Sequence, residues 1–209
     1  CRPCQKKTRK AADQRHTLVA PIEGYPFQRL SLDFVGPMNA SHKGNIYLLT
    51  IKDTFSKWLE AFPLKAATAN AVVNILEKEI FARYGIPEAI HSDQGTQFTS
   101  RLFREVGDVF GIQITTTPAY NPKSNPVERS HRDLGVMLRA MVKDNAGSWE
   151  RVLPQALFAL RTYVCSSTGL SPYQLVFGRD ASQPIDNIIC QPPGQLRSGG
   201  LDHHEYARE

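Results

Sequence analysis

The hydrophobic positions of the first half of the body follow the two-residue period of strands. Residues 30–35 alternate in this way, and Gly36 with Pro37 ends the run. Two further apolar runs, 46–51 and 58–64, are joined by a turn-like segment and predict an antiparallel hairpin. The pattern therefore predicts three strands in a meander at the start of the body.

Helices and strands alternate after this meander. Helical spacing predicts helices within 68–84, 100–112, 125–145 and 149–164, and short β-rich runs at 88–93 and 113–119 predict strands between them. This order is typical of the α/β class. We predict a mixed five-stranded sheet, made of the meander followed by alternating helices and strands, with helices flanking it.

Two of the predicted helices carry apolar stripes. In 100–112 the stripe is Leu102, Phe103, Val106, Val109 and Phe110. In 125–145 it is Val127, Leu134, Leu138 and Met141, with a separate polar face of Glu128, Arg132, Gly135 and Arg139. Such stripes indicate helices that cover the sheet.

Composition places the chain among globular proteins, since 41% of its 209 residues are hydrophobic and 22% are charged. No apolar run is as long as a membrane span, and the start lacks the layout of a signal peptide. The four cysteines are irregularly spaced, which favours a reducing compartment over a disulfide scaffold.

The net charge of +5 is concentrated at the start of the chain. Residues 1–20 hold six Lys and Arg against one Asp, and the other residues balance. Such an arm can bind nucleic acid through the release of counterions, or it is a solvated linker.

Cys1 and Cys4 have the C-x2-C spacing of half a tetrahedral zinc site, but the sequence has no His-x3-His to complete it. Either the chain is a fragment cut through a zinc module, or the cysteine pair is incidental. We therefore predict three parts. Residues 1–24 are the C-terminal remnant of a zinc-binding domain with a basic linker, and 25–180 are the main domain. Residues 181–209 are a Pro/Gly-rich tail or the truncated start of another module.

Three acidic residues lie at positions that suit the binding of a metal ion. Asp33 lies in the middle of the first strand, Asp93 ends the strand at 88–93, and Glu128 lies one turn into a helix. If the first and fourth strands are neighbours, Asp33 and Asp93 meet and Glu128 can reach them from the helix. Converging carboxylates suit Mg²⁺, and two such ions roughly 3.5–4 Å apart can activate and stabilise the oxygens of a phosphodiester reaction.

Each acid also has a purely structural interpretation. Asp33 can be a buried acid paired with Arg or Lys, and Asp93 can be a turn residue. Glu128 fits a capping box with Asn125. Asp53 lies in another plausible turn, and we predict that its role is structural.

Several segments resemble one family in the family's own order. They are "LSLDFVGP", "IKDTFSKWLEAFPL", "YGIPEAIHSDQGTQFTSRLF", "GIQITTTPAYNPKSNPVERSHRDL" and "STGLSPYQLVFGR". Over about residues 1–180 the chain closely resembles the integrase of Gypsy-type LTR retrotransposons, and more distantly the retroviral integrases.

The resemblance implies a ribonuclease H-like core whose D-D-E triad is Asp33, Asp93 and Glu128, with two Mg²⁺ or Mn²⁺ ions as cofactors. It implies an endonuclease and polynucleotidyl transferase that processes the 3′ ends of element DNA and joins them to target DNA without ATP. Cys1 and Cys4 would bind Zn²⁺ only together with His ligands from further upstream. The implied partners are double-stranded DNA and further copies of the chain, as a dimer or tetramer, with no membrane. The implied location is the nucleus, with a cytoplasmic virus-like-particle stage.

The same resemblance assigns the loop after residue 116 to contact with a DNA end, although an ordinary surface loop is the alternative. The candidate DNA-binding residues are Gln94, Thr96, Tyr120, Asn121, Lys123, Ser124, Asn125, Arg129 and Arg132. Arg139 can also contact phosphate, since the guanidinium fork suits phosphate oxygens, but a solvated helix face is the alternative for these arginines. We interpret His91 and His131 as hydrogen-bonded structural residues rather than catalytic bases.

One feature departs from the family. Between Asp93 and Glu128 lie 34 residues, where the family usually has 35, and the difference falls just before the helix. If the helix starts one residue later, Glu128 keeps its orientation. If the helix register shifts, Glu128 turns about 100° away. This motivates an alternative function, a catalytically retired integrase core that a host keeps as a DNA-binding or assembly module. A nuclease that only hydrolyses is a further alternative.

Overall fold

The structure is a computed structural model that describes residues 23–116, 127–142 and 146–182. Its five strands are β1 (Arg29–Val35), β2 (Tyr47–Asp53), β3 (Leu59–Leu64), β4 (Ala89–Ser92) and β5 (Gln113–Thr116). They form one sheet in the order β3-β2-β1-β4-β5, antiparallel from β3 to β1 and parallel from β1 to β5. The predicted mixed five-stranded sheet and its opening meander are confirmed.

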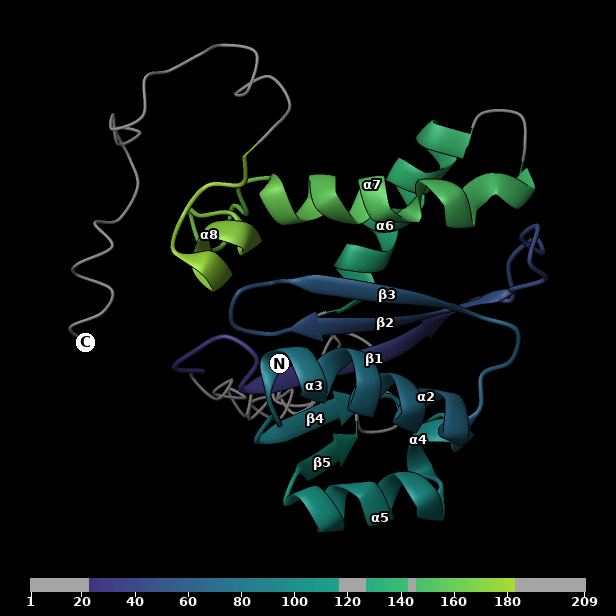
Figure 1. Cartoon of the computed structure of the whole chain (residues 1–209), viewed down its shortest axis with the longest axis vertical. Helices are drawn as coiled ribbons and strands as arrows, with labels where there is room; N and C mark the ends of the chain where they lie inside the picture. The colour runs from purple at the N-terminus through teal and green to yellow at the C-terminus, as the bar shows by residue number, and fades with distance from the viewer. Residues whose placement is uncertain (1–22, 117–126, 143–145, 183–209) are drawn as a thin grey trace, which may run out of the picture.

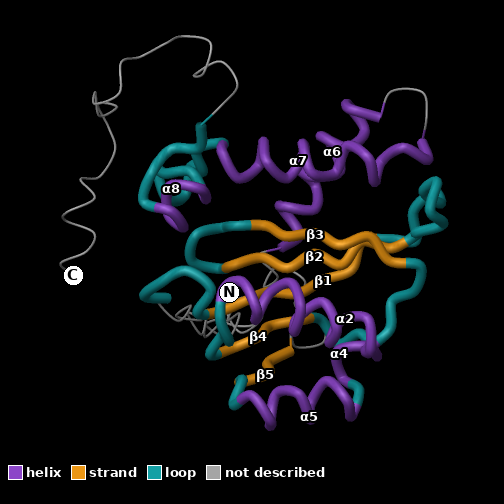
Figure 2. The backbone as a smooth tube through the Cα atoms, viewed as in Figure 1, coloured by secondary structure: helices purple, strands orange, loops and turns teal. Residues whose placement is uncertain are grey.

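The helices cover both faces of this sheet (Figure 1). On one face lie α2 (Ala69–Ile75), the π-helical segment η1 (Leu76–Phe81), α3 (Ala82–Tyr84), α4 (Thr96–Thr99) and α5 (Arg101–Phe110). On the other lie α6 (Val127–Val142), the 3-10 turn η3 (Ala146–Ser148), α7 (Trp149–Thr162) and α8 (Pro172–Phe177). Figure 2 shows the strands as the middle layer between these two groups.

The predicted helix at 68–84 forms as one continuous run with an unpredicted π-helical middle. Thr68 caps it, because its hydroxyl accepts a hydrogen bond from the Ala71 N–H. Gly85 ends it with a φ of 87°, a backbone conformation that favours glycine. Val72, Leu76 and Ile80 are at most 1% exposed and form the face that packs on the sheet.

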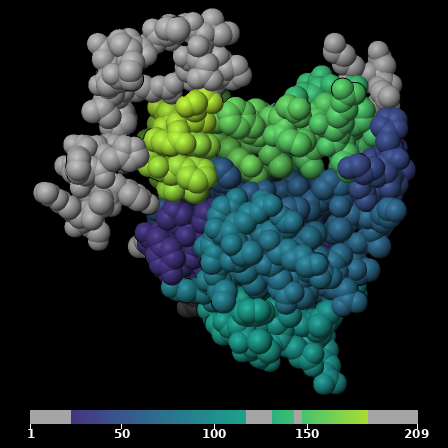
Figure 3. All heavy atoms as spheres, viewed as in Figure 1, coloured from purple at the N-terminus to yellow at the C-terminus, as the bar shows by residue number. Residues whose placement is uncertain are grey.

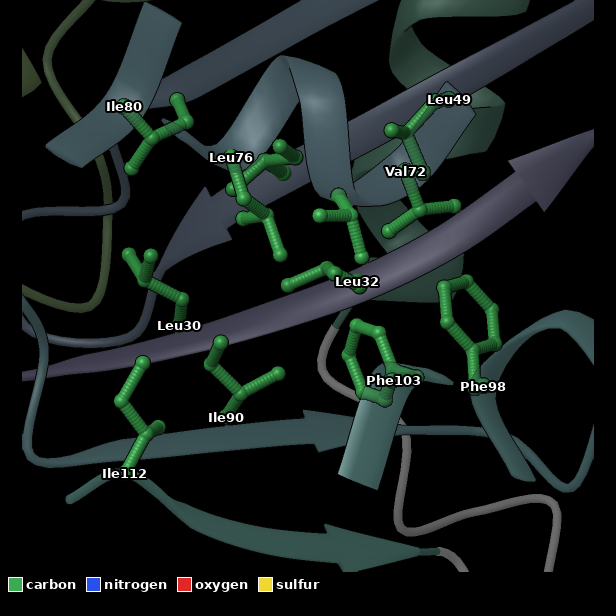
Figure 4. Close-up of a cluster of buried hydrophobic side chains, with 12 residues drawn as sticks. Leu30, Leu32, Leu49, Val72, Leu76, Ile80, Ile90, Phe98, Phe103 and Ile112 are labelled. Carbon is green, nitrogen blue, oxygen red and sulfur yellow. The ribbon is translucent and has the colours of Figure 1, made fainter. Parts of the chain in front are cut away.

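Each helical layer has its own hydrophobic core. Figure 4 shows the first core, in which Leu30 and Leu32 of β1 meet Val72, Leu76 and side chains of α4 and α5. The second core joins β2 and β3 to Leu134 and Leu138 of α6 and to the buried face of α7. The space-filling view shows the layers packed as one continuous body (Figure 3).

Parts of both predicted apolar stripes are wrong. Leu102 is 36% exposed, Val109 79% and Met141 39%. In α5 the buried face centres on Phe103 and Gly107 instead. A Cβ at Gly107 would lie only 2.5 Å from Ile114 Cδ1, so this glycine lets the helix backbone approach β5 closely. Val109, about 200° further around the helix, faces solvent.

Glu60 of the edge strand β3 contacts helices of both layers. Its Oε2 lies 2.6 Å from Arg161 Nη2 of α7, and its Oε1 accepts hydrogen bonds from Tyr84 Oη at 2.7 Å and Trp58 Nε1 at 3.0 Å. Burial, followed by the hydrogen bond to Glu60 and its charge, raises the pKa of Tyr84 to about 12.

Tyr84→Phe should reduce the change in the free energy of unfolding between pH 9 and pH 12. The raised pKa means that Tyr84 contributes stability fully below pH 10, and that this contribution is lost as pH rises toward 12. We expect the free energy of unfolding of Tyr84→Phe to be about 1–2 kcal/mol lower than that of wild type at pH 9, because a hydrogen bond to a charged group disappears. Near pH 12 the two free energies should become similar. Urea unfolding from pH 9 to 12 measures this, with the exposed Tyr163→Phe as control. A deficit that stays constant across this range would contradict the assignment.

Candidate active site

The pairing of β1 with β4 brings two of the predicted acids together. The strands are parallel neighbours, and the last paired residues are Leu32 and Ser92. Asp33 and Asp93 are the next residues on each strand. Adjacent strands lie about 4.8 Å apart, so the two positions are side by side at the carboxyl end of β4. The condition set by the sequence pattern, that the first and fourth strands be neighbours, is met.

Asp33 lies on the sheet face that α6 covers, with its side chain 18% exposed. Its Oδ1 accepts a hydrogen bond from the Phe34 N–H at 2.8 Å. Its Oδ2 lies 3.6 Å from His131 Nδ1 of α6. Thr50, which is opposite Asp33 on β2, donates its hydroxyl to the Asp33 carbonyl at 3.0 Å. Thr50 thus binds the main chain of Asp33, while the Asp33 carboxylate is bound by the Phe34 N–H and lies beside His131 of α6.

Asp93 combines the turn role and the strand-end position that the sequence offered as alternatives. Its Oδ1 accepts a hydrogen bond from the Gly95 N–H at 2.9 Å, which closes a turn directly after β4. A Cβ on Gly95 would lie 2.9 Å from that same Oδ1. Gly95 therefore leaves room for the carboxylate beside the start of α4.

Glu128 lies in the first turn of α6, and its side chain is outside the described part of the structure. Its role as the third acid therefore stays a prediction. Three residues further along, His131 contacts β1 and β2. Positions three apart on a helix are neighbours on its surface, so position 128 lies about 60° around α6 from His131.

Both histidines near the strands are bound by threonine hydroxyls, as the sequence interpretation expected. His131 Nε2 lies 2.6 Å from Thr50 Oγ1, and His91 Nδ1 lies 3.1 Å from Thr115 Oγ1. Burial and then the charge of Lys52 lower the pKa of His131 to about 4. Burial and then Arg29 lower the pKa of His91. His131 is therefore neutral at pH 7.

The donor set fits a hard divalent cation, since carboxylate oxygens of two adjacent strand positions are the ligands that Mg²⁺ prefers. Among the side chains that the structure describes, no cluster of three or more His, Cys, Asp and Glu has metal-binding geometry. A third carboxylate ligand would have to come from a side chain that the structure does not describe. Glu128 is the residue that the sequence predicts for this role.

Asp53 has the structural role predicted for it. It is 1% exposed, and its carboxylate accepts hydrogen bonds from the N–H groups of Phe55 and Ser56 in the β2–β3 turn. Burial, as the largest influence, raises the pKa of Asp53.

The other predicted site residues are only partly within the described structure. Gln94, Thr96, Arg132 and Arg139 are exposed, with Thr96 the first residue of α4 and the two arginines on α6. Tyr120, Asn121, Lys123, Ser124, Asn125, Cys1 and Cys4 lie outside the described residues, as does the side chain of Arg129. The sequence reasoning missed Thr50, which the two-residue period of β2 places on the Asp33 face. Among the described helices, none is long and apolar enough to cross a membrane.

The fold is that of integrase catalytic cores, which is the ribonuclease H-like fold. The catalytic core domain of BIV integrase is 28% identical with a TM-score of 0.57, and the match covers 71% of this chain and 92% of that one. A chain of the simian T-cell lymphotropic virus intasome, solved in complex with PP2A regulatory subunit B56 gamma, has a TM-score of 0.66 at 24% identity. That match covers 78% of this chain and 61% of the other.

Sequence comparison also finds similarity to integrases. Residues 25–122 match the family described as the integrase core domain. The Gag-Pol polyprotein of Walleye dermal sarcoma virus is 36% identical over 161 residues, covering 76% of this chain and 9% of the relative. The Pro-Pol polyprotein of Simian foamy virus type 3 is 31% identical over 163 residues, covering 78% and 14%. Over residues 25–122 the chain is thus similar to the integrase core domain, and the chain spans only a small part of these polyproteins.

Gly95→Ala should weaken the binding of a divalent cation at this site. The added methyl group would press on the Gln97 side chain and on Asp93 Oδ1, so the Asp93 carboxylate must shift from its present position. We expect the affinity for Mn²⁺, measured by isothermal titration calorimetry, to fall about tenfold or more. Gly24→Ala is the control, because a Cβ there meets only Gln28 Oε1 at 3.9 Å. Equal affinities in the two variants would show that the space at Gly95 does not matter to the site.

Proposed function

We propose that the chain is the integrase of a Gypsy-type LTR retroelement, and that it processes 3′ ends of element DNA and joins them to target DNA. The observation that carries this proposal is the in-register pairing of β1 with β4, which places Asp33 beside Asp93. The similarity to the integrase core domain supports the same reaction class. We assign the third carboxylate to Glu128.

The proposed site holds Mg²⁺, or Mn²⁺, through Asp33, Asp93 and Glu128. A solved relative, the HTLV-2 integrase catalytic core domain, is described in complex with magnesium, which supports this choice. Bound Mg²⁺ would supply Lewis-acid activation of the attacking oxygen and stabilisation of the leaving oxygen. The protein's own part is to hold the carboxylates in place, through the Phe34 N–H for Asp33 and the Gly95 N–H for Asp93.

We propose double-stranded DNA and further copies of the chain as partners. The exposed Gln94 and Thr96 follow Asp93 directly, so they are placed to meet a DNA strand whose phosphate reaches the acids. Exposed Arg132 lies one turn beyond position 128 on α6 and can bind a neighbouring phosphate. Loop residues 120–125 and the basic arm extend the proposed surface, and Cys1 with Cys4 belongs to the proposed zinc-binding half. We place the activity in the nucleus.

The joining reaction tests the proposed function directly. We expect the full chain with Mg²⁺ and a short end-labelled duplex to give joined products longer than the input. Asp33→Asn, Asp93→Asn and Glu128→Gln should each abolish them, because each removes a ligand charge. Asp108→Asn on exposed α5 is the matched control and should leave them intact. Unfolding midpoints measured for all four variants exclude misfolding as the cause.

Three outcomes would each overturn this proposal. Joined products that persist in Asp93→Asn would remove the acids from the mechanism. DNA binding without joining, equal in wild type and all variants, would favour the retired module. Cut strands without any joined product would favour a hydrolytic nuclease.

Arg132→Ala should weaken DNA binding to a similar extent on unrelated sequences. A phosphate contact carries no sequence information, so the slope of log affinity against log salt should become shallower by about one unit. Fluorescence anisotropy on two unrelated duplexes measures both effects. Arg101→Ala on α5 is the control, since Arg101 is exposed and pairs with Glu105. A loss confined to one sequence would contradict phosphate binding.

A further inference from the structure

A cavity of about 290 Å³ lies on the α6 side of the sheet, apart from the two acids of the candidate active site. Its walls come from β2, β3, α6, α7 and the connection between α7 and α8. Leu59, Leu160 and Pro172 form the apolar part of the lining. Sites for small molecules are concave and largely apolar, and a few polar groups decide what they bind. The polar part of this lining therefore indicates the kind of ligand.

The polar part of the lining is dominated by two lysines. Lys52 of β2 is only 8% exposed, and Lys57 lies in the turn that follows β2. The exposed Ser166 and Ser167 add two hydroxyl groups from the connection between α7 and α8. The acid that lines the cavity, Asp133 of α6, is exposed, so water screens its charge more than that of the buried Lys52. The lining therefore favours an anion.

The charge of the lysines acts on two neighbouring groups. The hydrogen bond with Ser167, whose Oγ lies 3.2 Å from Cys165 Sγ, lowers the pKa of the Cys165 thiol, and the charges of Lys52 and Lys57 lower it further. After burial, the charge of Lys52 is also the next cause that lowers the pKa of His131. Both shifts have the sign that a positive potential produces.

A buried hydroxyl beside Lys52 also lacks a partner. Ser31 of β1 is directly opposite Lys52 in the strand register, so the two side chains project from the same face of the sheet. Ser31 is 1% exposed, and no described residue forms a hydrogen bond with its Oγ. Buried polar atoms in proteins nearly always have a partner. An acceptor that enters beside Lys52 would take the Ser31 proton.

We infer that this cavity is a binding site for a small molecule that carries a phosphate group. Lysine binds phosphate oxygens as a point charge, and serine hydroxyls donate to them. The apolar part of the lining would cover the rest of the molecule. DNA is another source of phosphate, but the size of the cavity and the burial of Lys52 favour a small ligand. The inference goes beyond the proposed function, because it needs neither the acids nor a metal ion.

The experiment titrates the full chain with inorganic pyrophosphate by calorimetry, in low-salt buffer free of divalent metal. We expect Lys52→Met and Lys57→Met each to weaken binding about tenfold or more, because a charge-assisted hydrogen bond is lost. Methionine removes the charge and keeps most of the side-chain length. Lys78→Met on the exposed face of η1 is the matched control and should bind as wild type does. Unfolding midpoints show whether each variant is folded.

The thiol of Cys165 reports whether the ligand lies in this cavity. Bound pyrophosphate should slow its alkylation by the neutral reagent iodoacetamide in wild type but not in Lys52→Met, as measured by mass spectrometry on the peptide that carries Cys165.

Four results would each overturn the inference. They are no pyrophosphate binding by wild type, equal affinities in wild type and Lys52→Met, equal losses in Lys52→Met and Lys78→Met, and binding that leaves Cys165 unprotected. Protection of Cys165 by a single-stranded oligonucleotide without terminal phosphate, and not by pyrophosphate, would assign the cavity to the DNA backbone and overturn the small ligand.

Discussion

The whole site depends on the register of one pair of parallel strands. β1 and β4 pair with Leu32 opposite Ser92, so Asp33 and Asp93 follow as neighbours. A slip of one residue would move every side chain of a strand to the other face of the sheet. That slip is opposed by the core under the other face, where Leu30, Leu32 and Ile90 are at most 1% exposed. The hydrophobic face of each strand thus positions the acids on the opposite face.

Placing Asp33 beside Asp93 creates electrostatic repulsion, and the same repulsion favours the binding of a divalent cation. Two carboxylates on adjacent strand positions repel each other. The backbone N–H groups of Phe34 and Gly95 each hold one carboxylate oxygen in place. A divalent cation between the acids would remove the repulsion. His131, which lies beside Asp33, is neutral at pH 7 and so adds no positive charge that would compete with such a cation.

The sequence predicted what depends on local periodicity and missed what depends on packing between elements. The strand pattern at 30–35 and the end of a strand at Asp93 were readable, and so was the condition that their strands be neighbours. The orientation of α5 was not, because it depends on the close approach of Gly107 to Ile114. The contact of His131 with Thr50 was also hidden, since it requires the rotation of α6 about its axis relative to β2. The carboxylate of Glu128 stays a prediction from sequence.

The packing of α6 on the sheet bears on the spacing of 34 residues between Asp93 and Glu128. The rotation of α6 about its axis is determined where the helix contacts the sheet, by His131 on Thr50 and by Leu134 and Leu138 in the second core. All three positions come after residue 128 in the same continuous helix. A residue lost before the helix shortens the connecting loop, but it does not change the angle between position 128 and these contacts. The angular position of residue 128 therefore follows from the packed part of α6, which argues that the shorter loop is compatible with a third carboxylate at the site.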